Sequence, residues 1–162
     1  MKIRPILLSL SVLAVAACGS SRTPEVARAA PLYPGETPEL RLLINQYADH
    51  YQVPRQLVHK VVQRESDYRP GARNGPYYGM MQILPETARG MGFRGQSSDL
   101  LDAETNLTWA VKYLRGAWLV SDGDMDEAVM WYARGYYYEA RDRCQLVETG
   151  LLNREIAKHC RV

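Results

Sequence analysis

The longest stretch of regular apolar spacing lies at residues 103–120, and it constrains the fold most strongly. Apolar side chains recur there every three or four residues: Leu107, Ala110, Val111, Leu114, Ala117 and Trp118. This spacing predicts one helix with a continuous buried face. No segment of useful length alternates between apolar and polar residues, so strands should be absent or minor. With 162 residues, the chain has room for a single all-α domain with its own core.

Shorter helices are predicted before this segment. Thr37 and Pro38 form an N-cap followed by proline at the first helical position, and helical apolar spacing continues from there to Tyr51. Pro54 opens a second helix. Glycine and proline interrupt residues 67–77, which predicts a loop. We expect a short helix at residues 79–84 and a further turn or short helix from Pro85.

Two helical segments are predicted after residue 120. Asp124 and Glu127 resemble a capping box that starts a helix running to about Arg134. A last helical stretch begins at Tyr136 and carries both remaining cysteines. The alternating Asp122, Asp124 and Asp126 do not form a calcium loop, because the required glycine and final glutamate are missing.

Residues 1–17 have the pattern of an export leader. Lys2 and Arg4 precede an apolar run at 6–17 that is too short to cross a bilayer. Residues 14–16 could form an A-x-A cleavage site. Residues 15–19 instead resemble the lipobox of bacterial lipoproteins, in which Cys18 becomes lipid-modified, and we favour this route. Residues 18–36 then form a flexible tether, and residues 37–162 form the domain.

The cysteine count fits this interpretation. The chain has three cysteines, an odd number for an exported protein. If Cys18 carries lipid, Cys144 and Cys160 remain as a disulfide candidate in an oxidising compartment, with two free thiols as the alternative. The bridge would hold the C-terminal tail and contribute about 3 kcal/mol.

The charge and histidine patterns exclude other classes. Lys2 and Arg4 account for the whole net charge of +2, so the chain from Cys18 onward is neutral and has no electrostatic reason to bind nucleic acid. His50, His59 and His159 have no helical partner for a metal site, and we expect them at the surface or the domain boundary. We predict no metal and no cofactor.

Glu65 is the leading catalytic candidate by position. It lies near the C-terminal end of the second predicted helix, where the helix dipole disfavours an ionised carboxylate. Val61 and Val62, one turn earlier, indicate a segment that faces the core. Both effects raise a carboxyl pKa toward the range of a general acid. Arg64 and Arg73 are close in sequence and could oppose this shift.

Four ordered segments carry a family resemblance. Residues 64–70 (RESDYRP) and 79–88 (GMMQILPETA) resemble the two leading motifs of the soluble lytic transglycosylase family. Residues 106–114, which begin with Asn106 and end in Tyr113 and Leu114, resemble its third motif. Residues 128–135 (AVMWYARG) stand where the family has A-Y-N-x-G.

The resemblance implies a lysozyme-like helical domain that cleaves the β-1,4 bond between N-acetylmuramic acid and N-acetylglucosamine in peptidoglycan. It makes Glu65 the acid that protonates the leaving oxygen. Glu65 then acts as the base that helps the muramoyl C6 hydroxyl attack C1, which leaves a 1,6-anhydro end. The substrate-binding residues that it implies are Gln82, Tyr132, Ser66, Leu84 and Tyr78.

A single carboxylate suits this chemistry. Glycosidases commonly need two carboxylates, yet a turn accounts for Asp67, a helix start for Glu86 and a capping box for Glu127.

The chain departs from the family in the fourth motif, where Ala133 stands in place of the asparagine that follows the motif tyrosine.

Two alternatives remain open: a lysozyme-type hydrolase acting on the same bond, and a non-catalytic lipoprotein that binds murein. The expected partners are glycan strands and, through the lipid, a membrane. In a Gram-negative cell, inner-membrane retention is linked to an aspartate after the lipidated cysteine. Gly19 stands there instead, so for such a cell we expect the outer membrane, facing the periplasm.

Overall fold

The computed structural model describes residues 30–160, and the compact domain begins at Pro31. The predicted leader, Cys18 and most of the tether lie outside the described residues. The helices are α1 (Pro38–His50), α2 (Arg55–Ser66), α3 (Pro85–Gly90), α4 (Ala103–Val120), α5 (Met125–Arg134) and α6 (Tyr137–Asp142), with 3₁₀ helices η1 (Ser97–Leu101) and η2 (Lys158–Cys160). Across residues 30–160 no helix combines the length and apolar character needed to cross a membrane.

One small antiparallel hairpin interrupts the helices. Its strands are β1 (Arg73–Asn74) and β2 (Tyr77–Tyr78), and Arg73 pairs with Tyr78. In the part of the chain that the structure describes, these two strands form the whole sheet. The predicted all-α class is therefore confirmed.

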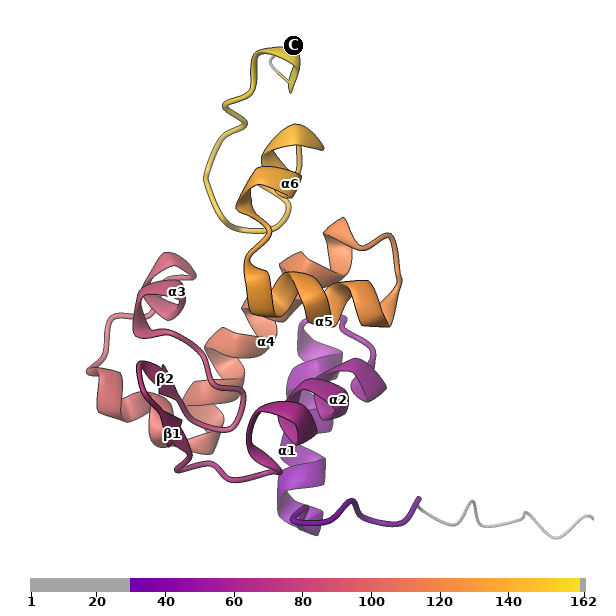
Figure 1. Ribbon diagram of the computed structural model, residues 1–162, viewed down its shortest axis with the longest axis vertical. Coiled ribbons are helices and arrows are strands. Elements are labelled where there is room, and N and C mark those ends of the chain that lie inside the picture. Colours follow the sequence, from indigo (N-terminus) through magenta and orange to yellow (C-terminus); the bar gives the residue numbers. More distant parts are fainter. Residues whose placement is uncertain (1–29, 161–162) are drawn as a thin grey trace, which may run out of the picture. The chain divides into compact units, whose positions relative to one another are not determined.

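Helix α4 forms the centre of the domain. It packs against α1, α3, α5 and η1, and Figure 1 shows it running behind α5, with the hairpin and α3 on one side and α1 and α2 on the other. Its predicted apolar face is fully buried from Leu107 to Ala117. Burying one such leucine contributes about 2 kcal/mol.

Side-chain caps explain where the helices begin. The hydroxyl of Thr37 accepts a hydrogen bond from the backbone N–H of Leu40, as the N-cap prediction requires. Asp102 caps α4 in the same way. Asp124 caps α5 by accepting from the N–H of Glu127 over 2.8 Å. The N-cap interpretation of Asp124 is therefore confirmed, whereas the side chain of Glu127 accepts from the indole of Trp131 and does not complete a capping box.

The helix expected at residues 79–84 is absent. Gly79 has φ +74° and Gln82 has φ +49°, both outside the helical region. A Cβ at Gly79 would lie 2.1 Å from the carbonyl oxygen of Leu100, so this close approach requires glycine. The segment is a tight loop, and an isolated bridge between Tyr78 and Ile83 closes its base.

The last helix is also shorter than expected. Helix α6 ends at Asp142, and Cys144 follows it with φ +59°, a conformation that cannot continue a helix. Cys160 lies in η2. The structure joins the two cysteines in a disulfide with a Cα–Cα distance of 5.4 Å.

The chain packs onto the domain from Pro31, six residues before the expected start at Thr37. The side chain of Glu36 is fully buried and accepts hydrogen bonds from the backbone of Tyr33 and from Arg41, each over 2.8 Å. A buried carboxylate needs such partners.

His59 lies under this segment and is buried, contrary to the expectation for the histidines. Its ring nitrogens contact the Tyr68 hydroxyl at 3.0 Å and the Asn45 side-chain oxygen at 3.2 Å. These two polar partners allow the imidazole to be buried.

Candidate active site

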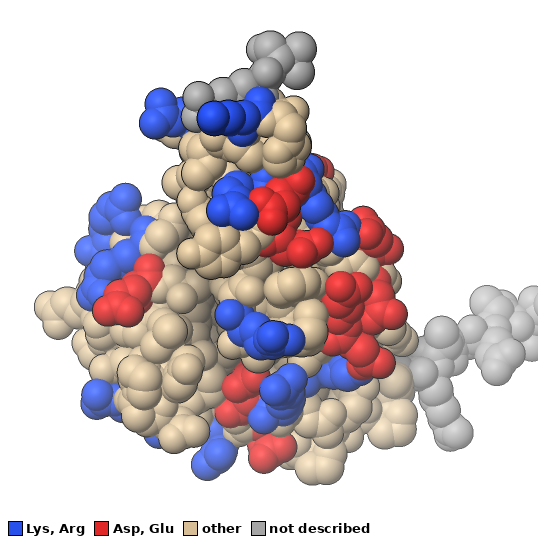
Figure 2. Space-filling model, turned by 45° about the horizontal axis from the view of Figure 1, so that its top comes forward, with Lys and Arg blue, Asp and Glu red and all other residues tan. Residues whose placement is uncertain are grey.

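An open cleft of about 520 Å³ lies where the end of α2 meets the hairpin, the 79–84 loop, the middle of α4 and the end of α5. Its walls are formed by Arg64, Glu65, Asn74, Tyr77, Gln82, Ile83, Leu84, Thr87, Tyr113, Tyr132, Ala133, Arg134 and Gly135. The structure thus brings the predicted Glu65, Gln82, Leu84 and Tyr132 together. Figure 2 shows basic and acidic side chains intermixed on the face that it displays.

Glu65 lies in the last turn of α2, and its side chain is 24% exposed. Burial raises the pKa of its carboxyl group, and the positive charge of Arg64 partly opposes this effect. Nε of Arg64 lies 3.7 Å from Oε1 of Glu65. Arg73 does not pair with Glu65, because its guanidinium lies over the ring of Tyr78, 4.7 Å from the centroid. The shift has the predicted direction, and it favours a proton donor.

Glu65 is the one carboxylate among the residues that line the cleft. Asp67 and Glu86 are exposed and lie outside the lining. The side chain of Glu127 accepts a hydrogen bond from the indole N–H of Trp131 over 3.2 Å. No second carboxyl group in the described lining can therefore activate a water molecule opposite Glu65.

Gln82 presents a single free acceptor. Its amide nitrogen donates to the carbonyl oxygens of Gly79 (2.7 Å) and Ala72 (3.1 Å). Because both partners are acceptors, the nitrogen must face them. The amide oxygen of this 8%-exposed residue is buried without a partner. Such an orphan in a cleft wall can accept an N–H or O–H from a ligand.

Tyr132 forms the wall beside Glu65. Its hydroxyl donates to the carbonyl oxygen of Met81 over 2.9 Å. Burial and then the nearby charge of Glu65 hold its pKa well above the ordinary value, so the phenol stays neutral. The ring of Tyr113 lies 5.5 Å from that of Tyr132, and burial raises the pKa of Tyr113 to about 12. Tyr113 lies within the third motif, but the motif pattern alone indicated no role for it.

Asn106 holds the 79–84 loop from α4. It is fully buried, and its side-chain oxygen accepts from the N–H of Met81 over 2.9 Å. Its side-chain nitrogen donates to the carbonyl oxygens of Tyr78 and Leu100, each at 2.9 Å. The first residue of the third motif therefore positions the second motif. In the sequence, the position of Asn106 at the start of the third motif was the one sign of its role in holding the loop.

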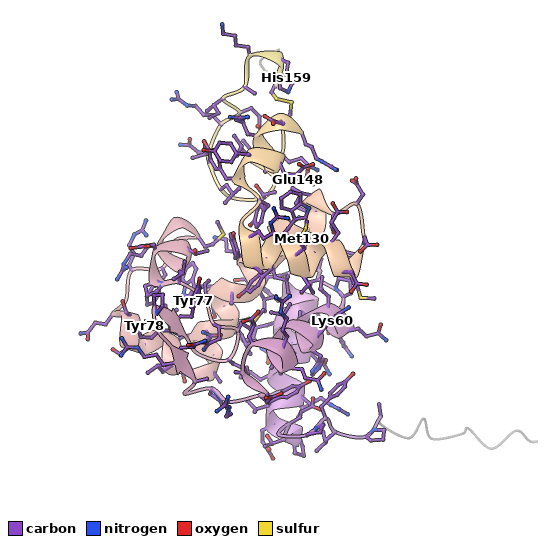
Figure 3. All side chains as sticks on the ribbon, in the orientation of Figure 1. Lys60, Tyr77, Tyr78, Met130, Glu148 and His159 are labelled. Carbon is purple, nitrogen blue, oxygen red and sulfur yellow. A yellow bond between two sulfur atoms is a disulfide. The ribbon has the colours of Figure 1, made fainter. Side chains whose placement is uncertain are left out.

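The structure places the predicted Ser66 and Tyr78 outside the cleft wall. The hydroxyl of Ser66 donates to the carbonyl oxygen of Met80 over 2.7 Å, which turns it inward beneath the loop. The backbone of Tyr78 exchanges two hydrogen bonds with Ile83. Tyr77 lines the cleft instead, and Figure 3 shows both tyrosines on the hairpin.

One cluster near the C-terminus consists of residue types that can bind a metal ion, but its two cysteines form a disulfide. Ligand atoms of Cys144, His159 and Cys160 lie within 4.8 Å of one another. Both sulfur atoms are bonded to each other in the disulfide, so neither is a thiolate ligand.

The structure thus shows a helical domain with one partly buried carboxylate in an open cleft that Tyr77, Tyr113 and Tyr132 line. Comparison with protein-family models identifies the family. The Transglycosylase SLT domain model matches residues 42–144, more than half of the chain. The chain belongs to this family, whose assignment supports lytic transglycosylase activity on peptidoglycan in general. No solved structure matches the chain.

Proposed function

We propose that this protein cleaves the bond between N-acetylmuramic acid and N-acetylglucosamine with Glu65 as both acid and base, and leaves 1,6-anhydromuramoyl ends. One observation carries this proposal: Glu65, with its raised pKa, is the one carboxylate in the described lining of the cleft. An intramolecular reaction needs a single group that first gives and then takes a proton.

The first step uses the protonated form of Glu65. Its proton passes to the glycosidic oxygen as the bond from that oxygen to C1 breaks, and positive charge develops at C1. In the second step the carboxylate takes the proton of the C6 hydroxyl while that oxygen bonds to C1. Glu65 ends protonated, and no water is consumed.

The neighbouring side chains orient the sugar. The free amide oxygen of Gln82 is fixed in place by the two hydrogen bonds of its nitrogen, so it can accept from an acetamido N–H or a hydroxyl group at little entropic cost. The neutral ring of Tyr132 limits solvent beside Glu65 and keeps its proton affinity high.

The site of action follows from the N-terminal residues. The leader at 1–17 and a lipid on Cys18 would anchor the enzyme to the outer membrane, facing the peptidoglycan. The disulfide between Cys144 and Cys160 supports an oxidising compartment. Labelling with a radioactive fatty acid, lost on Cys18→Ala, tests the anchor.

The product end tests the reaction. The chain from Gly19 onward is incubated with purified peptidoglycan, and the released muropeptides are weighed by mass spectrometry. We expect ends lighter by one water molecule than reducing ends, and no release with Glu65→Gln. Reducing ends would establish the hydrolase. Binding of Glu65→Gln and of wild type without any release would establish the non-catalytic lipoprotein, an alternative favoured by the missing amide at Ala133.

A further inference from the structure

A second hollow of about 420 Å³ continues from the cleft between α2 and α5. We name it the side hollow. It is lined by Lys60, Arg64, Asp126, Val129, Met130, Ala133 and Arg134. Figure 3 shows Lys60 on α2 and Met130 on α5. Arg64, Ala133 and Arg134 line both hollows, so the side hollow opens directly beside Glu65.

The rim of the side hollow is cationic. Its lining holds three cations and one carboxylate, Asp126, which pairs with Lys60. Arg64 lies beside Glu65 of the cleft, with 3.7 Å between its Nε and Oε1 of Glu65. The guanidinium of Arg134 donates to the sulfur of Met130 over 3.5 Å, and no ion pair joins it to a described carboxylate. Arg134 is therefore available to an anion, and guanidinium groups favour carboxylates.

The floor of the side hollow is apolar, because Val129, Met130 and Ala133 form it. Its lining contains no aromatic ring and no amide side chain. The cleft differs, since Tyr77, Gln82 and their neighbours supply both. An apolar floor with cations at the rim fits a short chain of methyl groups and carboxylates better than a sugar ring.

We propose that the side hollow binds the peptide stem of the muramoyl residue being cleaved. This inference rests on the proposed function, which places that residue at Glu65. The stem is attached to the lactyl group of the same sugar, and it carries alanine methyl groups and free carboxylates. One of its carboxylates pairs with Arg134, and its methyl groups cover Met130. Another carboxylate approaches Lys60 beside the exposed ion-pair partner of this lysine, Asp126. The preferred substrate is therefore glycan with peptide stems.

Ala133 lies at the connection between the cleft and the side hollow. It is exposed in the wall shared by the two hollows. An asparagine at this position, as in the family motif, adds an amide group to that wall. With alanine at this position the amide contact to the sugar is lost, and the stem can pass from the cleft into the side hollow.

The test compares two substrates made from one preparation. Soluble glycan strands are used with their stems, or after an amidase has removed them, and kcat/KM for anhydro ends is measured on each. We expect the wild-type protein to prefer stem-bearing strands. Lys60→Glu and Arg134→Glu should each lower the ratio of the two kcat/KM values about five-fold, the effect expected for one partly exposed ion pair. Lys60→Arg keeps the positive charge and should keep the wild-type ratio.

Arg154→Glu is the matched control, because Arg154 is exposed and lines neither hollow. It should leave the ratio unchanged. Added salt should lower the preference of the wild-type protein through screening. If Lys60→Glu fails to fold, Lys60→Gln replaces it.

Different results would contradict the side-hollow proposal and the proposed function. Anhydro ends with no preference for stems, or an unchanged ratio in both charge-reversal variants, would overturn the side-hollow proposal alone. Reducing ends, or no release from either substrate, would overturn the proposed function.

Discussion

The hydroxyl of Tyr132 donates its hydrogen bond to the carbonyl oxygen of Met81, 2.9 Å away. This contact joins α5 to the 79–84 loop, which carries Gln82. Asn106 holds the same loop from α4 through the N–H of Met81. The backbone of one residue is thus bound from two helices, which fixes the loop that carries Gln82.

Replacing Tyr132 by phenylalanine should leave the Met81 carbonyl oxygen buried without this donor. We expect the free energy of unfolding to fall by about 1–3 kcal/mol, the cost of one unsatisfied buried group. Urea unfolding measures it. Tyr138→Phe is the control, because Tyr138 is 69% exposed and should change stability by less than about 0.5 kcal/mol. Equal losses in the two variants would contradict this role of Tyr132.

Asn106→Leu should be more damaging. The substitution removes three hydrogen bonds and leaves the N–H of Met81 and the carbonyl oxygens of Tyr78 and Leu100 without them. We expect a loss of about 3 kcal/mol or more. Asn153→Leu, at an exposed position, supplies the comparison. A stable variant with full activity would show that the loop holds its own conformation.

The rate should depend on pH through Glu65. Burial raises its pKa, so the protonated acid persists above the pH at which an exposed glutamate ionises, and kcat falls as the pH rises through the raised value. Arg64→Gln removes the charge that opposes the shift. The alkaline limb of kcat on stem-free strands should therefore move to higher pH. A move of this limb to lower pH would contradict the effect of Arg64 on the pKa of Glu65. The control variant Arg154→Gln should leave the alkaline limb unchanged.

Removing the disulfide should loosen the tail. Cys144 and Cys160 are 16 residues apart, and closing a loop of this length restricts the unfolded chain by about 3 kcal/mol. The double variant Cys144→Ser, Cys160→Ser should lose about that much stability in urea. A reductant should destabilise the wild-type protein similarly and leave the double variant unaffected. Equal stability of both proteins would show that the bridge contributes little.

The helices were predictable where local signals agreed. Thr37 and Asp124 stand at the predicted helix starts, and the predicted helix at 103–120 has the same bounds as α4. The loop at 79–84 was not predictable in this way, because contacts with Leu100 and Asn106 determine its conformation. Its apolar side chains are equally compatible with a helix.

The site was predictable in its chemistry more than in its geometry. The motif pattern indicated Glu65, Gln82 and Tyr132, which do share the cleft. It could not show that Ser66 turns inward, because a serine hydroxyl serves a backbone carbonyl as readily as a ligand. The side hollow depends on α2 packing against α5 and leaves no signal in the spacing of residues.

In the proposed reaction, Glu65 catalyses cleavage without water as a reactant. The most direct measurement is digestion of peptidoglycan in water enriched in heavy oxygen, followed by mass spectrometry of the new muramoyl ends. We expect ends that are one water molecule lighter than reducing ends and contain no heavy oxygen. Heavy oxygen at C1 of the new ends at the moment of release would contradict the proposed reaction and establish hydrolysis.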